Sequence, residues 1–321
     1  MIDKLLSEGE RMPPGRLRRV FSRDPLLSAM FVEKGKQTGQ LPKVKKIVKR
    51  MGMEDIGEFL RRYSKPEDVL LAGCKECLEY FPSIGQEGVM LAASNPQLLE
   101  RVLKKAERLG IALHVAVNRG NVESVRMLLE KGADPNGVDQ WGKTPLFYAR
   151  SWEVAEMLLK HGARVNIRDR EGKTALHEAA MYAEELVLLY IQYGAKVDVQ
   201  DKGGNTPLHY AVMYGNGLAV EVLSRLGNIH LTTNDGSTAL HLAVKRGRFV
   251  KELIEKGADP GWKDGRGKDV YYYAIYHCER CFEELPLPEN VKEVMEEAID
   301  HPEVLKRLIN KMEIGERVKE A

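Results

Sequence analysis

Short apolar segments recur along the middle of the chain at a nearly constant distance. In TALHLAV (238–244) and FVKELIEKG (249–257), apolar residues fall on one side of about two helical turns. Segments of this length do not form stable helices alone in water. The copies are marked by threonines 30, 32 and 32 residues apart, at Thr144, Thr174, Thr206 and Thr238. The pattern therefore predicts helix pairs that bury their apolar sides against neighbouring copies, which is the architecture of a solenoid.

The amino-acid sequences of these copies resemble the ankyrin repeat. The resemblance rests on the segments TPLHYAVMYGN, LLEKGADPN and DKGGNT (201–206). Similar segments recur along the chain with similar spacing. It covers about residues 86–285 and is strongest over 111–260, with five recognisable copies and two degenerate ones. The second copy is shorter than the family pattern before its Leu-Leu pair, and the fifth is shorter after Gly247. The resemblance implies an all-α, helix-turn-helix solenoid with β-turn fingers.

A histidine recurs in the same place of each tetrapeptide such as TPLH, which raises the question of a reactive group. The resemblance implies instead that the threonine and the histidine join each finger to the first helix by hydrogen bonds. Thr206 suits a helix N-cap, and Pro207 suits the first helical position, where no N–H is needed. Phe147 holds the position in the second copy. We therefore predict scaffolding, without catalytic, cofactor-binding or metal-binding roles, for His114, His177, His209 and His241.

The resemblance also indicates where a partner protein binds. Ankyrin-like proteins mostly use the concave face formed by the finger tips and the first helices. Aromatic and arginine side chains are the residue types that anchor protein interfaces. We expect a row of rings framed by positive finger tips, and hence a partner with acidic residues. The predicted contact residues are Trp141, Tyr148, Arg168, Arg170, Tyr182, Lys202, Tyr210, Met213, Tyr214, Lys245 and Arg246.

Residues 1–85 do not resemble ankyrin repeats, and their helix signals predict a separate helical region. These signals are Asp24-Pro25, Leu41-Pro42 and a capping box at Ser64 to Glu67. Apolar residues of LPKVKKIVKRM, at Val44, Ile47, Val48 and Met51, fall on one helical side, with lysines and arginines mainly on the other. The cationic side contacts nucleic acid or an acidic partner in one interpretation. In the other, which we favour, the helix docks on its neighbours with a solvated lysine face.

Charge is distributed unevenly along a chain whose formal net charge is only +2. Residues 11–50 carry twelve Lys or Arg against two acidic residues, and the end of the chain is acidic. Residues 286–321 predict two amphipathic helices, broken near His301-Pro302, that cover the end of the repeats. No apolar run is long enough to span a membrane, and the start lacks a signal-peptide core, so we expect a soluble cytoplasmic protein. The abundance of Lys and Glu and the small number of Cys favour a heat-adapted source.

Two Cys-x-x-Cys pairs, Cys74/Cys77 and Cys278/Cys281, are the remaining candidates for chemistry. Zinc ligands, local disulfides and free thiols are all consistent with this spacing. Each pair falls within an apolar helical pattern, so the sequence favours buried free thiols. A shared zinc site would have to join the two ends of the repeat array.

Three function classes follow. The first is a non-enzymatic module that binds another protein through the concave face of the repeats. The second is a nucleic-acid-associated protein that uses the basic segment 11–50. The third is an effector with a catalytic part in residues 1–85, although no nucleophile elbow, phosphate loop or metal-binding histidine pair is present in the sequence.

Overall fold

The computed structural model describes residues 1–106 and 109–320, without the side chains of Lys75 and of 313–320. Their secondary structure is helical, and extended segments pair only at the isolated bridges Ile84–Ala106 and Thr232–Thr238. This confirms the all-α expectation. The chain divides into two compact units, Met1–Gly137 and Val138–Ala321, which are described separately as unit 1 and unit 2. The boundaries at residues 85 and 286 stay predictions.

Unit 1 begins with a helical cluster around three phenylalanine rings. Phe21 lies 5.3 Å from Phe31 and 5.0 Å from Phe59, measured between ring centroids, and all three side chains are fully buried. The helix pairs α7/α8 and α9/α10 follow and pack on each other as stacked repeats do. The elements of unit 1 are α1 (Ile2–Glu8), η1 (Gly9–Arg11), α2 (Pro14–Arg23), α3 (Pro25–Gln37), α4 (Leu41–Arg50), α5 (Ile56–Tyr63), α6 (Pro66–Leu71), η2 (Lys75–Tyr80), α7 (Gln86–Ala92), α8 (Pro96–Leu103), α9 (Ala112–Asn118) and α10 (Val122–Glu130).

Two of the predicted helix starts in this cluster are confirmed and one is displaced. Asp24 caps α3 by accepting the N–H of Leu27 at 3.2 Å, and α4 begins at Leu41. The predicted capping box is wrong by one residue, because α6 starts after Lys65, whose N–H is bound by the side chain of Asp68 at 2.7 Å. Ser64 is buried and donates its hydroxyl to the carbonyl of Pro25, so it is not free to cap.

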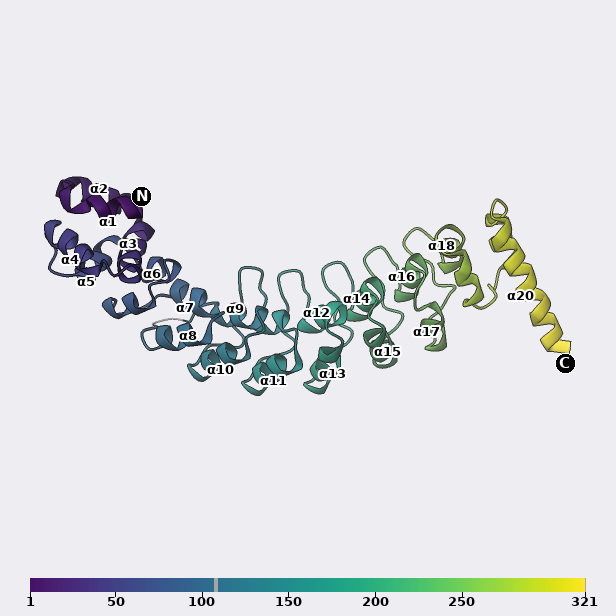
Figure 1. The fold of residues 1–321 in the computed structure, drawn as a ribbon. Helices are drawn as coiled ribbons and strands as arrows, with labels where there is room; N and C mark the ends of the chain where they lie inside the picture. The colour runs from purple at the N-terminus through teal and green to yellow at the C-terminus, as the bar shows by residue number, and fades with distance from the viewer. Residues whose placement is uncertain (107–108, 321) are drawn as a thin grey trace. The chain divides into compact units, whose positions relative to one another are not determined.

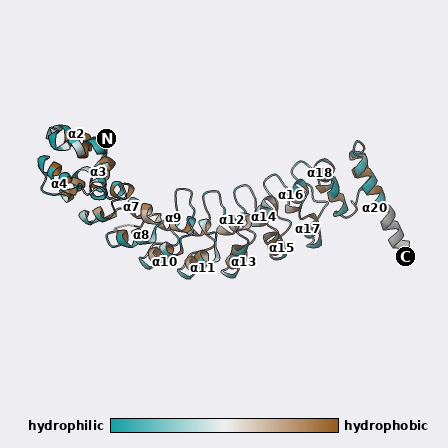
Figure 2. Cartoon of the chain, viewed as in Figure 1, coloured by the Kyte–Doolittle hydropathy of each residue, from teal (hydrophilic) through white to brown (hydrophobic). Residues whose placement is uncertain are grey.

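Unit 2 consists of inner and outer helices that alternate along the chain, with a finger loop before each inner helix (Figure 1). Successive inner helices pack on one another, and so do the outer helices α11, α13 and α15. Hydrophilic and hydrophobic residues interleave along these helices (Figure 2). The inner elements are η3 (Pro145–Tyr148), α12 (Ala175–Tyr182), α14 (Pro207–Tyr214), α16 (Ala239–Arg246) and α18 (Val270–His277). The outer ones are α11 (Trp152–Lys160), α13 (Glu184–Gln192), α15 (Gly217–Leu226) and α17 (Val250–Glu255).

Both shortened copies have a local structural consequence. In the second copy the inner helix is reduced to η3, a single stretch of 3₁₀-helix. In the fifth copy the turn after Gly247 tightens, and Phe249 takes a left-handed conformation with φ 61°. A non-glycine residue seldom adopts this conformation, which shows how the deletion is absorbed.

The finger loops are rigid because their backbone is bonded within each finger and between fingers. Asp201 accepts the N–H groups of Gly203 and Asn205, both at 2.8 Å, and equivalent bonds occur at Asp139, Asp169 and Asp264. Neighbouring tips are joined by one backbone bond each, from the N–H of Arg170, Lys202, Asn234 and Gly265, at 2.8 to 3.0 Å. Gly204 is required at its tip, since a Cβ there would lie 2.7 Å from the nitrogen of Asn234.

The recurring threonine and histidine form the predicted scaffold contacts. Nδ1 of His177 accepts the N–H of Thr174 at 2.9 Å, and Nε2 lies 3.3 Å from the carbonyl of Asn205 in the next finger. Because Nδ1 is an acceptor, Nε2 carries the proton and donates it across the repeat boundary. His241 repeats the arrangement with Thr238 and Lys268. Burial lowers the pKa of His177 and His209 to about 4, and it also lowers the pKa of His241.

Two further helices, α19 (Val291–Glu297) and α20 (Pro302–Glu320), follow the repeats after a short 3₁₀-helix, η4 (Glu279–Glu283). Helix α19 packs on α18 and α20 packs on η4, so the end of the stack is covered, as expected. The break between them falls at Pro302, as predicted. Within the described residues, no helix is long and apolar enough to cross a membrane.

Both cysteine pairs are disulfides, which corrects the expectation of free thiols. The expectation assumed continuous helices, but α6 ends at Leu71 and α18 ends at His277, each followed by a tight 3₁₀ turn. The turn brings the Cα atoms of Cys74 and Cys77 to 5.3 Å and those of Cys278 and Cys281 to 5.4 Å, within disulfide range.

The two disulfide turns are built alike. The second cysteine of each pair begins a similar segment, CLEYFP at Cys77–Pro82 and CFEELP at Cys281–Pro286. The ammonium group of Lys105 donates to the carbonyls of Leu78, Glu79 and Phe81 at 3.0 to 3.1 Å. Lys311 donates to the equivalent carbonyls of Phe282, Glu283 and Leu285. A lysine therefore satisfies the open carbonyls of each short helix.

Removing the disulfide of unit 2 is expected to lower stability. Closing a loop of four residues stabilises a fold by about 2 kcal/mol in the chain-entropy model. We expect Cys278→Ser with Cys281→Ser to lower the free energy of unfolding of unit 2 by about that amount in urea titrations followed by circular dichroism. Dithiothreitol should shift the wild-type curve more than the curve of the variant, which keeps only the Cys74–Cys77 disulfide of unit 1. Identical wild-type curves with and without reductant would contradict the assignment.

The buried histidines predict a defined acid range for loss of stability. An exposed histidine has a pKa near 6.5, and the folded chain lowers this to about 4 for His177 and His209, so protonation favours the unfolded state. Their contribution is complete above about pH 6.5 and is lost as the pH falls toward 4. We expect urea midpoints to fall over this range, and His177→Asn with His209→Asn to flatten the dependence. A midpoint that stays constant between pH 7 and 4.5 would rule out neutral buried imidazoles.

Candidate functional site

The candidate site is the inner face of unit 2, defined here as the surface of the finger loops, η3, α12, α14, α16 and α18. The fingers and the threonine–histidine bonds described above hold its backbone, so its side chains project from fixed positions. Some of these side chains are bound within the scaffold, and others remain exposed.

Three tyrosines of the inner face are bound to finger aspartates of their own repeat. The hydroxyls of Tyr148, Tyr210 and Tyr273 donate to Asp139, Asp201 and Asp264 at 2.5 to 2.6 Å. Burial and the adjacent carboxylate raise the pKa of each tyrosine, to about 12 for Tyr273. These hydroxyls therefore stay protonated and act as hydrogen-bond donors rather than as acids.

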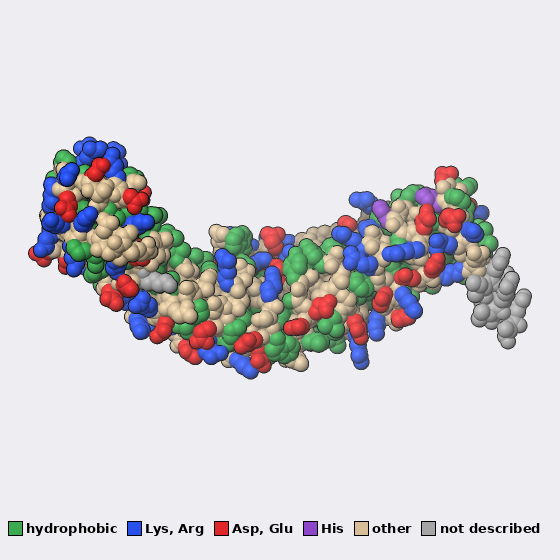
Figure 3. Space-filling model, viewed as in Figure 1, with side chains coloured by type: hydrophobic (Ala, Val, Ile, Leu, Met, Phe, Trp, Pro, Cys, Tyr) green, Lys and Arg blue, Asp and Glu red, His purple; other side chains and the backbone are tan. Residues whose placement is uncertain are grey.

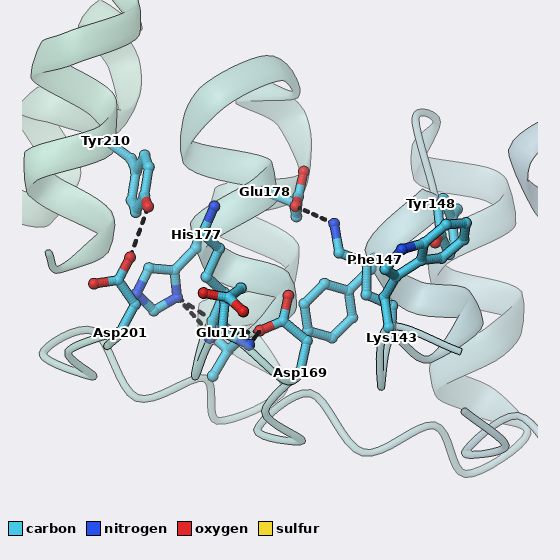
Figure 4. A network of polar contacts seen from close by, with 12 residues as sticks. Lys143, Phe147, Tyr148, Asp169, Glu171, His177, Glu178, Asp201 and Tyr210 are labelled. Carbon is cyan, nitrogen blue, oxygen red and sulfur yellow. Dashed lines mark hydrogen bonds and ion pairs between the residues drawn. The ribbon is translucent and has the colours of Figure 1, made fainter. Parts of the chain in front are cut away.

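Glu178 holds the position of these tyrosines in the third repeat and makes a different contact. Its carboxylate cannot pair with Asp169, the local finger aspartate, because both are acidic. It accepts instead from the ammonium group of Lys143 in the preceding repeat, at 2.7 Å (Figure 4). The same ammonium group lies 5.8 Å from the centroid of Phe147. A charged pair, only 10% exposed at the Glu178 side chain, thus lies between two repeats of the inner face.

Next to this pair, two tyrosines are exposed and packed against each other. Tyr182 is 57% exposed and Tyr214 is 49% exposed, and their ring centroids are 5.2 Å apart in an edge-to-face arrangement. The guanidinium group of Arg150 lies 5.5 Å from the centroid of Tyr182. Tyr210 lies behind Tyr214, at 6.3 Å between centroids. We call Arg150, Tyr182 and Tyr214 the aromatic cluster.

Three of the predicted contact residues make contacts within the scaffold. Tyr210 is only 9% exposed and is held by Asp201. Arg168 donates to the carbonyls of Gly172 and Gln200, so its guanidinium group joins two fingers. Lys245 lies 4.0 Å over the ring of Tyr273, and burial lowers its pKa. Of the three, only Tyr210 is buried, whereas Arg168 remains exposed and Lys245 half-buried, so contact of these two with a partner stays a prediction.

The other predicted contact residues keep at least part of their surface. Trp141, at 57%, Arg170, Lys202 and Arg246 are exposed, and Tyr148 and Met213 are half-buried. Tyr182 and Tyr214 complete the exposed set. Arg150, Lys143 and Glu178 were not among the predicted contact residues, although they lie beside the exposed rings or between the repeats that carry them. The signal for Glu178 was present, since an acidic residue follows the histidine where Tyr148 follows Phe147 and Tyr210 follows His209.

The buried polar groups beneath the inner face are engaged in the scaffold. The buried histidines of unit 2 are committed to backbone groups, and the aspartates at the finger bases accept backbone N–H groups. Within residues 1–106 and 109–320, no three His, Cys, Asp or Glu side chains converge in a way that could hold a metal ion. The exposed groups of the inner face are rings and cations on a fixed backbone.

Comparison with known proteins agrees with this architecture. A solved structure of the ankyrin repeat domain of Bcl-3, described as a unique member of the IkappaB protein family, is similar with a TM-score of 0.51 and 29% identity. The match covers 57% of this chain and 91% of that one. Protein HOS4 of Saccharomyces cerevisiae is 52% identical over 40 residues, and Cyclin-dependent kinase 4 inhibitor B of Rattus norvegicus is 56% identical over 34.

These two curated relatives are matched only locally. The matches cover 12% and 11% of this chain, and the chain spans 4% of the yeast protein and 26% of the rat protein. The family model described as Ankyrin repeats (3 copies) matches residues 89–169, 152–233 and 219–294, which together make up more than half of the chain. The chain therefore belongs to the ankyrin repeat family.

Proposed function

We propose that the chain is an interaction module that binds another protein through the inner face of unit 2. The observation that carries the proposal is the aromatic cluster, in which two packed tyrosine rings remain about half exposed on a rigid backbone. An exposed aromatic pair of this kind offers a large area for burial at low entropic cost. Membership of the ankyrin repeat family supports a role in protein interaction, and one relative is by its name an inhibitor of a kinase, which is a protein.

The rigidity of the face adds to its suitability for binding. The finger bonds and the histidine bonds fix the backbone on both sides of α12 and α14. Tyr182 is further held between Tyr214 and Arg150. Because these groups are ordered before a partner arrives, less conformational entropy is lost on association.

The charge around the cluster favours an acidic partner segment. Arg150, Arg170, Lys202 and Arg246 are exposed on the inner face or at its finger tips. Glu178 of α12 is already paired with Lys143, while Glu171 and Asp235 are exposed at the finger tips. The exposed cations beside the rings attract an incoming carboxylate, which favours association and the correct register.

Replacing the two rings tests the proposal. We expect Tyr182→Ala with Tyr214→Ala to weaken capture of the partner from a cell extract at least about tenfold, the effect of losing a central pair of interface rings. A matched control is Trp152→Ala with Tyr193→Ala, which removes two similarly exposed rings at the ends of the outer helices α11 and α13. Captured proteins would be quantified by mass spectrometry, and folding checked by circular dichroism. Equal capture by all three proteins would contradict the proposal.

A second candidate function is nucleic-acid binding by unit 1. Helices α2 and α4 expose rows of cations, and Figure 3 shows Lys and Arg side chains gathered over this part of the unit. The apolar side of α4 is fully buried, as predicted, and Arg18 fixes α2 to α4 by donating to the carbonyl of Met51 at 2.5 and 3.1 Å. The exposed cations are Arg16, Arg19, Arg23, Lys43, Lys45, Lys46, Lys49 and Arg50.

A salt titration of binding to random duplex DNA tests this candidate. Each phosphate contact contributes about 0.9 to the slope of log K against log salt. We expect Lys43→Gln, Lys46→Gln and Arg50→Gln together to reduce the slope by about 3 and the affinity at least about tenfold. The matched control replaces Lys65, Arg101 and Lys104, exposed elsewhere in unit 1, by glutamine. Absence of binding at low salt, or equal losses in both variants, would eliminate the candidate.

A further inference from the structure

Unit 2 contains a pocket of about 610 Å³ beyond its last finger. It lies between that finger, helix α18 and the segment that leads from η4 into α19; α18 is labelled in Figure 1. We call it the terminal pocket. Its volume falls in the range of pockets that bind small molecules or short peptide segments.

Apolar groups line part of the terminal pocket. Ile275 and Val294 are buried, and Pro286, Leu287 and Pro288 form the segment between η4 and α19. Leu287 is 37% exposed. Such a wall can cover the aliphatic part of a long side chain whose polar end lies elsewhere.

The polar groups of the pocket are mainly acidic. Five carboxylates line it, against the two ammonium groups of Lys263 and Lys268; the carboxylates belong to Asp259, Asp269, Glu289, Glu293 and Glu297. None of the five forms an ion pair with a cation in the part of the chain that the structure describes. Asp259, Asp269, Glu293 and Glu297 accept hydrogen bonds from neutral donors, such as the Tyr276 hydroxyl, 3.0 Å from Glu297. The pocket thus has a surplus of negative charge that the chain itself does not neutralise.

The hydroxyl of Tyr271 lies in the electrostatic field of these carboxylates. It is buried against the pocket and donates to the carbonyl of Pro286 at 3.1 Å. Burial raises the pKa of Tyr271, and the nearby charges of Asp269, Asp259 and Glu289 raise it further. A positive group placed here would be stabilised by the same field.

One wall of the pocket already holds a cation over a ring. The ammonium group of Lys268 lies 4.0 Å from the centroid of Tyr272, and both residues line the pocket. A cation over the face of an aromatic ring is attracted by the negative charge of the π-system. The wall therefore combines an aromatic face with dispersed carboxylates.

We propose that the terminal pocket binds an arginine-bearing, extended segment of a partner protein. The carboxylates are dispersed around the pocket, and among the described residues no three of them converge to hold a metal ion. This arrangement suits a cation with delocalised charge better than a compact one. A planar guanidinium group can both stack on a tyrosine and bond separate carboxylates. The prolines and Leu287 supply apolar contact for the stem of the side chain. This site is independent of the inner-face proposal.

The probe for this proposal is a fluorescein-labelled peptide, Gly-Arg-Pro-Arg-Gly, titrated with the full chain and followed by anisotropy at about 0.15 M salt. A peptide with citrulline in place of both arginines keeps the shape and removes the charge. We expect saturable binding of the arginine peptide and at least tenfold weaker binding of the citrulline peptide. Equal binding of the two peptides, or binding of neither, would overturn the proposal.

Paired charge variants locate the site. Glu289→Gln with Glu293→Gln removes two pocket charges, and Gln can still accept the bond that Asn290 donates to Glu293 at 2.7 Å. Glu279→Gln with Glu303→Gln removes two exposed charges outside the pocket lining. We expect a loss of affinity of at least tenfold for the first pair and less than twofold for the second. Similar losses for both pairs would show general attraction and overturn the assignment to the pocket.

A final comparison tests the ring. Lys268→Met removes the cation that covers Tyr272, whereas Lys263→Met removes a lining cation that lies over no ring of the described residues. We expect the arginine peptide to bind more tightly to both variants, with the larger gain for Lys268→Met. Equal gains would overturn the role of Tyr272, and a loss with Lys268→Met would overturn the cation-binding wall.

Discussion

The bond between a neutral histidine and the next finger is the interaction on which the inner face depends. Each inner helix of unit 2 is at most about two turns long and would not persist alone. His177 and His241 each accept a backbone N–H within their own repeat and reach a carbonyl of the following one. Because the imidazole must be neutral to do both, the same burial that lowers its pKa keeps the fingers in register.

Variation at the position after the histidine is what gives the inner face its local character. Where a tyrosine stands there, its hydroxyl is bound to the finger aspartate of the same repeat. Where Glu178 stands there, the bond crosses to Lys143 of the preceding repeat. Leu242 stands there in the fifth repeat, and Glu178 is found beside Tyr182, in the region where exposed rings are packed together. The scaffold is regular, and a single change of residue type alters the surface next to it.

Most of the fold could be predicted from the sequence because the regular spacing of the motifs makes the repeats recognisable. The stacked helix pairs, the structural histidines and the buried side of α4 are confirmed by the structure. Contact residues were harder to predict, since Arg168 and Lys245 find their partners about 30 residues away, in the next repeat. A pattern along one repeat shows which side a residue occupies, but it does not show whether the next repeat covers it.

The cysteines illustrate a different reason for failure. Each Cys-x-x-Cys pair was interpreted as part of a continuous helix, whereas both helices end before the pair. The signal that could have revealed this was the similarity of CLEYFP and CFEELP, which follow the two pairs in the same register. Lys105 and Lys311 cap the resulting turns, and their roles depend on tertiary contacts across more than 20 residues.

Hydrogen exchange of the full chain with and without its captured protein partner tests the central claim most directly, because it maps the contact surface without changing a residue. The account predicts slower exchange at the finger tips and along α12 and α14 when the partner is bound, with little change in α11, α13 and α15. Protection confined to those outer helices, or to residues 1–137, would contradict it.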